Sequence, residues 1–126
     1  MRGLVVTHGE LGRELVAASK LVVAGHRPLD VLSNTGHDAR QLRTRIAQWL
    51  EEPGDALVMV DEGAGSCGTA ARLAAAGRPS TWLVAGLNLA MVVTYLGSAA
   101  EVDGEELVEK MLARARHSVR RLGEIA

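Results

Sequence analysis

The sequence contains very few aromatic residues and a single cysteine, and both shortages restrict what the protein can be. Aromatic residues make up 2% of the 126 positions, with two Trp, one Tyr and no Phe. The core must therefore be aliphatic, and the aromatic platforms on which single-stranded nucleic acids stack are missing. One cysteine, Cys67, excludes an intrachain disulfide and a zinc site built from cysteines. We therefore expect no metal and no cofactor.

The chain also lacks an excess of charge of either sign and any long apolar run. Fourteen basic and fifteen acidic residues give a net charge of -1, which is no electrostatic footprint for nucleic acid. No segment approaches the roughly 18 apolar residues of a membrane span, and the apolar run near the N-terminus breaks at Thr7, too early for a signal sequence. Hydrophobic residues reach 48%, enough for a core. We expect one domain over residues 1–126, in the cytoplasm, with no membrane insertion.

Short apolar runs alternate with helical patterns along the whole chain. The runs predict strands, and the amphipathic stretches between them, several of which stop at Gly or Pro, predict helices. In the first helix the spacing of Leu11, Leu15, Ala18 and Val22 predicts the buried face, and in the last helix this face extends to Leu122. The expected strands are 3–6, 29–33, 55–60 and 81–86, and the expected helices are 10–25, 37–52, 69–77, 88–97 and 103–125.

This alternation predicts an α/β protein of the small doubly wound type. Right-handed crossovers place helices on both faces of a mainly parallel, four-stranded sheet, for which we predict the strand order 2-1-3-4. Strands 1 and 3 are then neighbours, and the crevice at their carboxyl ends is where such folds bind ligands. His8 follows the first strand and Asp61 follows the third. The topology therefore brings the two side chains to one edge.

His8, Asp61 and the glycine-rich stretch "GAGSCG" at 63–68 form the candidate catalytic site. A carboxylate that accepts a hydrogen bond from Nδ1 fixes the imidazole tautomer and leaves the Nε2 lone pair free to attack. A glycine turn that leads into a helix offers amide groups to a phosphoryl group. An isolated histidine after a strand is more often a loop or core residue, but the three features together favour a phosphohistidine intermediate.

Other interpretations of the same residues are weaker. "GAGSCG" matches the G-x-G-x-x-G pattern of dinucleotide-binding proteins, but it follows the third strand and no acidic residue ends the next one. "AGSCG" is similar to a nucleophile elbow, although the chain is short for a hydrolase of that kind. The bland interpretation of Cys67 is a small packing residue. His26 and His37 lie beside turn residues, where solvated side chains are expected.

Three segments in order resemble the IIA components of the mannose-type (mannose/fructose/sorbose) sugar phosphotransferase system. They are "LVVTHGELGRELVAASKLVVAG", "VMVDEGAGSCGTAARLA" and "VAGLNLAMVVTYL". The resemblance implies a phosphocarrier that accepts a phosphoryl group from HPr and passes it to a IIB-type partner during phosphoenolpyruvate-dependent sugar uptake. It also implies a homodimer. A regulatory module that is phosphorylated on histidine without transport is the alternative, and a nucleotide-binding domain is a weaker one.

The resemblance assigns a role to each candidate residue. It implies that His8 is phosphorylated beside Asp61 and that Gly65 and Ser66 hold the phosphoryl oxygens; we place Thr7 in the same phosphate-binding set. The sequence departs from the family after Asp61, where Glu62 and Gly63 replace large apolar residues, and Cys67 replaces a usual proline. A negative charge at Glu62 must point away from a phosphoryl group on His8, so we expect an outward orientation.

Overall fold

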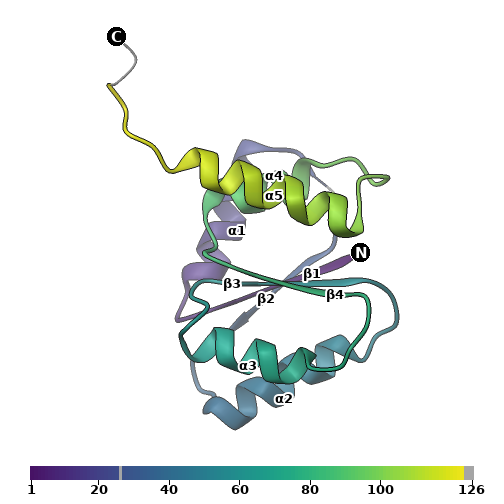
Figure 1. Ribbon diagram of the computed structural model, residues 1–126. Coiled ribbons are helices and arrows are strands. Elements are labelled where there is room, and N and C mark those ends of the chain that lie inside the picture. The colour runs from purple at the N-terminus through teal and green to yellow at the C-terminus, as the bar shows by residue number, and fades with distance from the viewer. Residues whose placement is uncertain (26, 124–126) are drawn as a thin grey trace.

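The computed structural model describes residues 1–25 and 27–123 and shows one four-stranded sheet. All neighbouring strands are parallel, and the order is β2-β1-β3-β4, which confirms the predicted fold class (Figure 1). The two central strands, β1 and β3, therefore end side by side. The strands are β1 (Arg2–Thr7), β2 (Leu29–Ser33), β3 (Ala56–Val60) and β4 (Thr81–Ala85).

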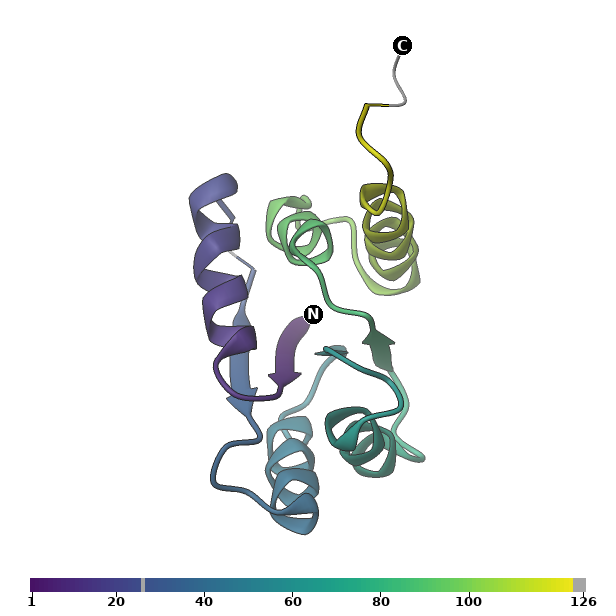
Figure 2. The same cartoon turned by 90° about the vertical axis from the view of Figure 1, so that its left-hand side faces the viewer.

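Helices cover both faces of the sheet. Figure 2 shows α2 and α3 together on one side and α1, α4 and α5 on the other, as right-handed crossovers require. The helices are α1 (Leu11–Val22), α2 (Ala39–Leu50), α3 (Ser66–Ala75), α4 (Leu89–Gly97) and α5 (Gly104–Ser118). Two of them begin at side-chain caps: Asp38 forms a capping box before α2, and Asn88 accepts the Met91 amide before α4.

The central strands are apolar because each supplies side chains to two cores. In β1, Val5 belongs to the core under α1, α4 and α5, whereas Leu4 and Val6 belong to the core under α2 and α3. Successive residues of a strand point to opposite faces, so a strand buried on both sides has no polar alternation. This arrangement fixes the rigid edge from which the functional loops emerge.

Several helix boundaries differ from those expected from the sequence, among them the end of α1, which lies at Val22 rather than at residue 25. Helix α3 begins at Ser66, three residues before the predicted start, so the glycine-rich stretch is partly helical. Helix α5 ends at Ser118. Leu122 therefore lies beyond the helix and is 83% exposed, so its assignment to the buried face was wrong. The predicted residues 124 and 125, like His26, lie outside the described residues.

The predicted buried face of α1 was also wrong in part. The helix buries Gly12, Val16 and Ser19, whereas Leu11 and Val22 are exposed. The reason is close packing: a Cβ at Gly12 would lie 2.8 Å from the Thr7 hydroxyl oxygen, so the helix approaches β1 through its smallest residue. Hydrophobic periodicity cannot predict a buried helix face whose residues are small rather than apolar.

Candidate active site

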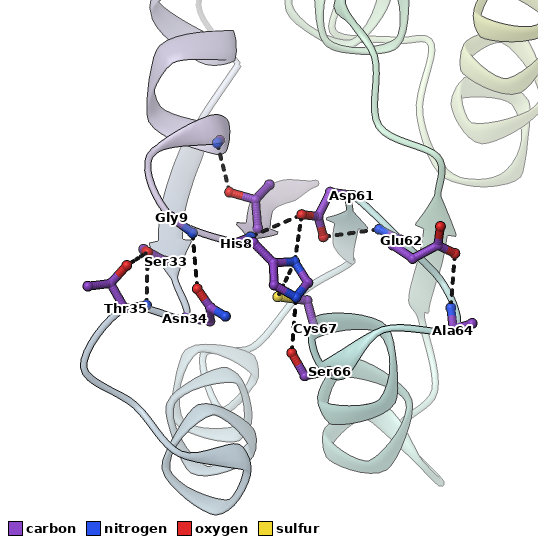
Figure 3. Close-up of polar contacts among 12 residues, drawn as sticks. His8, Gly9, Ser33, Asn34, Thr35, Asp61, Glu62, Ala64, Ser66 and Cys67 are labelled. Carbon is purple, nitrogen blue, oxygen red and sulfur yellow. Dashed lines mark hydrogen bonds and ion pairs between the residues drawn. The ribbon is translucent and has the colours of Figure 1, made fainter.

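His8 and Asp61 meet at the carboxyl edge of the two central strands. The residue pair Val6 and Val60 closes the β1–β3 register, and the chain then presents His8 and Asp61 to each other. Asp61 Oδ2 accepts a hydrogen bond from the His8 backbone amide at 3.0 Å. The same oxygen lies 2.8 Å from His8 Nδ1, within hydrogen-bond distance (Figure 3). The carboxylate thus holds both the backbone and the ring of the histidine.

The surroundings of Asp61 keep its side chain ionised. Partial burial pushes the pKa of Asp61 upward, but hydrogen bonds from the His8 amide and ring, together with the charge of His8, outweigh it and hold the pKa below its ordinary value. An ionised carboxylate only accepts hydrogen bonds, so Nδ1 must carry the proton. In a neutral ring the lone pair then belongs to Nε2.

Nε2 of His8 faces the first turn of α3. The Ser66 hydroxyl lies 3.2 Å from Nε2 and donates to it in this tautomer. Among the described residues no side chain caps α3, so the amide groups of its first turn are available to a ligand. The His8 side chain is 49% exposed while Asp61 is only 12% exposed. The imidazole is therefore half-exposed, whereas the carboxylate that orients it is sheltered.

The turn between Asp61 and α3 is held by contacts of its own. A Cβ at Gly68 would lie 2.3 Å from the Gly63 carbonyl oxygen, so the turn can pack against α3 at this point only because residue 68 has no side chain. Arg72 donates a 2.7 Å hydrogen bond to the same oxygen. The Gly65 amide donates to the Glu62 carbonyl at 3.3 Å. These contacts place Ser66 beneath the imidazole.

Glu62 turns away from the histidine, as its charge led us to expect. Its carboxylate folds back to accept the Ala64 amide at 3.2 Å, and Figure 3 shows the side chain directed away from the His8 ring. The negative charge therefore lies on the outer surface of the turn. There it faces whatever approaches the site.

Thr7 and Asn34 support the histidine from the other side. The Thr7 side chain is buried, and its hydroxyl accepts the Gly12 amide at 2.7 Å, which fixes the start of α1. The side-chain oxygen of Asn34 accepts a hydrogen bond from the Gly9 backbone amide at 3.0 Å. The backbone amide of Asn34 donates to the Thr7 carbonyl oxygen. Sequence analysis did not identify Asn34. Its position just after the second strand, at the same sheet edge, was the available signal.

Cys67 lies beside the His8 ring. Its thiol is buried, and Sγ lies 3.8 Å from His8 Nδ1. Burial, with the negative charge of Asp61 adding to it, raises the pKa of the thiol to about 11, so the group is protonated at neutral pH. Cys67 therefore packs beside the imidazole and belongs to the core under α2 and α3.

The fold and the site define a class: a small doubly wound domain with a His–Asp pair at the switch point of its sheet. Residues 3–112 match the model of the EIIA-man family, described as the PTS system fructose IIA component. The match spans most of the chain, which therefore belongs to this IIA family of the sugar phosphotransferase system. The family resemblance noted in the sequence is thus confirmed.

Solved structures show the same fold. The mannose/sorbose-specific IIA subunit from Enterococcus faecalis superimposes with a TM-score of 0.82 at 23% identity, over 96% of this chain and 93% of that one. The phosphotransferase component EIIA from Streptococcus agalactiae gives 0.83 at 15% identity, covering 95% of each chain. The IIA protein associated with the fucose utilization operon of Streptococcus pneumoniae gives 0.68 at 17% identity, over 95% and 91%. No curated protein sequence matches the chain. Among the described residues, no helix has the length and apolar content to cross a bilayer.

Proposed function

We propose that the protein is a cytoplasmic phosphocarrier in which His8 Nε2 accepts a phosphoryl group from HPr and passes it to a IIB-type partner. The observation that carries the proposal is the 2.8 Å contact between Asp61 and Nδ1, which assigns the lone pair to the exposed nitrogen. Membership of the IIA family supports the direction of transfer.

The transfer needs no change in the protonation of the ring. The Nε2 lone pair attacks phosphorus, the bond between phosphorus and the donor's nitrogen breaks, and the donor's nitrogen leaves with the electron pair. The Nδ1 proton stays in its hydrogen bond to Asp61, which stabilises the positive charge that develops on the ring. Transfer to the acceptor is the same displacement in reverse, with Nε2 of His8 as the leaving group.

The first turn of α3 supplies the phosphate site in this proposal. The Ser66 hydroxyl, which donates to Nε2 in the resting state, is free to donate to a phosphoryl oxygen once Nε2 is occupied. The Ser66 amide lies at the helix start, and the Gly65 amide joins it by giving up its 3.3 Å bond to the Glu62 carbonyl. Thr7 enters the proposal indirectly, because its buried hydroxyl fixes the turn that carries His8.

The assembly state and the partners belong to the same proposal. We propose that the chain works as a homodimer. HPr and the IIB-type partner would dock in turn on the edge that exposes His8, because both must reach Nε2.

Labelling of His8 tests this function. Incubation with phosphoenolpyruvate, enzyme I and HPr should give an acid-labile phosphoryl adduct on the wild-type protein, and His8→Ala should abolish it. The matched controls are His37→Ala and His117→Ala, which remove the other described histidines and should keep the adduct. An adduct that survives His8→Ala, or that either control variant loses, contradicts the assignment.

A further inference from the structure

The geometry points to a second use of this site: we propose that His8 Nδ1, Asp61 and Cys67 bind a zinc ion that switches off the nucleophile. Sγ of Cys67, Nδ1 of His8 and a carboxylate oxygen of Asp61 all lie within 4.8 Å of one another. A single cysteine cannot build a zinc site alone, but a mixed site with one thiolate, one imidazole and one carboxylate is a normal donor set for this metal.

Two of the distances between the ligand atoms bracket those of a tetrahedral zinc site. Zinc lies about 2.0–2.3 Å from such ligands, so tetrahedral geometry separates neighbouring ligand atoms by roughly 3.3–3.6 Å. The Nδ1–Sγ distance is 3.8 Å and the Nδ1–Oδ2 distance is 2.8 Å. A small tilt of the half-exposed imidazole opens the shorter distance. Water can supply a fourth ligand.

Charge and protons balance in the proposed site. The thiolate and the carboxylate together cancel the charge of a divalent cation, so the bound ion leaves no net charge in a partly buried place. Zinc displaces the thiol proton to solvent despite the raised pKa of Cys67, because coordination deprotonates a thiol. The imidazole proton moves from Nδ1 to Nε2. Starting from a neutral ring, binding releases one proton, so affinity must rise with pH.

The displaced imidazole proton is what makes the site regulatory. With zinc on Nδ1, Nε2 carries a hydrogen and has no lone pair to offer phosphorus. The inhibition rests on the proposed function, whereas zinc binding itself does not.

Binding is tested with metal alone on the full chain. Titration calorimetry should show one zinc per chain, and Co²⁺ should give the near-ultraviolet charge-transfer band of a thiolate ligand. Cys67→Ala should abolish the band and weaken zinc binding about a hundredfold or more. His37→Ala, which removes a histidine outside the site, should bind as the wild type does. If Cys67→Ala does not fold, His8→Gln removes a different ligand at a half-exposed position and should weaken zinc binding to a similar extent.

Inhibition is tested separately, with HPr phosphorylated in advance. At a zinc concentration ten times the dissociation constant, transfer to the wild type should slow about tenfold, and the rate of Cys67→Ala should stay at its own zinc-free value. Zinc binding that Cys67→Ala and His8→Gln leave intact overturns the proposed site. A zinc-free wild type that HPr does not phosphorylate would instead contradict the proposed function, and the cobalt spectrum would still decide the metal site.

Discussion

At the scale of single residues, Asp61 does two jobs with one carboxylate. Oδ2 accepts both donors of His8, and Oδ1 accepts the Glu62 amide at 3.0 Å. An asparagine at this position would have one oxygen and one NH2 group, so in either orientation the NH2 group would face a donor, which is the Glu62 amide or the two donors of His8. Only a carboxylate accepts all three hydrogen bonds, so Asp61 fixes both the histidine tautomer and the loop geometry.

We therefore expect Asp61→Asn to damage catalysis far more than the fold. The phosphoryl transfer rate should fall by on the order of 10²–10⁴, because a neutral amide does not stabilise the charge that develops on the ring and, where its NH2 group faces Nδ1, favours the other tautomer. The free energy of unfolding should fall by about 1–3 kcal/mol from the mismatched donor. Rapid-quench transfer from phosphorylated HPr and urea unfolding measure the two quantities. An unchanged rate would remove Asp61 from the mechanism.

The stability difference between Asp61→Asn and the wild type should depend on pH. The pKa of Asp61 is lowered on folding, so the carboxylate contributes stability that is fully present above its unfolded pKa and is lost as the pH falls through the folded one. Wild type and variant should therefore converge as the pH falls through and below the ordinary Asp pKa of about 3.9. The same urea experiments repeated across this range check the convergence.

Sequence analysis reached His8 and Asp61 because both follow central strands, and strand order determines which loops meet. It did not reach Asn34, whose contribution is a backbone-to-side-chain bond with Gly9 that no spacing reveals. It also treated Cys67 as packing alone. The placement of its thiol behind Nδ1 follows from α3 starting three residues earlier than hydrophobic periodicity indicated.

At the scale of elements, the start of α3 determines whether the site forms. The turn from Asp61 and the first turn of the helix touch where Gly68 passes the Gly63 carbonyl. The strands and the helix order could be predicted because buried parallel strands are continuous apolar runs. The start of α3 and the face of α1 could not, because close contacts through glycine decide both and hydropathy does not record them.

Gly68→Ala should therefore disrupt the site and the local fold together. A methyl group 2.3 Å from a carbonyl oxygen forces the turn away from the helix, so the Ser66 hydroxyl leaves Nε2. We expect a loss of about 1–3 kcal/mol of stability and slower phosphorylation of His8.

The control is Gly77→Ala. An added Cβ at this glycine has no atom within 4 Å, although the backbone has a φ of +76°. It should cost stability through backbone strain and leave the phosphorylation rate unchanged. Equal rates in the two variants would show that the helix start does not position Ser66.

At the scale of the whole molecule, recognition of a partner must depend on residues close to the site. A net charge of -1 provides little long-range steering, so the residues around His8 carry the recognition. Glu62 is exposed on the rim of the site, where the family resemblance leads us to expect a large apolar anchor. Interface cores favour such anchors and exclude charge. A partner that accepts Glu62 should instead present Lys or Arg to it.

We predict that a IIB domain from an ordinary mannose-type transporter accepts phosphate poorly from this protein, and that Glu62→Leu improves the transfer. Burying a leucine at the contact is worth about 1.5–3 kcal/mol, or roughly tenfold to a hundredfold in affinity. Gly63 is left unchanged, because a Cβ there would lie 3.2 Å from the Ala85 Cβ. Glu62→Gln is the matched control, since it removes the charge but keeps the acceptor for the Ala64 amide. The measurement is the initial transfer rate from each phosphorylated variant. A wild-type rate equal to that of a mannose-type IIA protein, or no gain in Glu62→Leu over Glu62→Gln, would show that this turn does not select the partner.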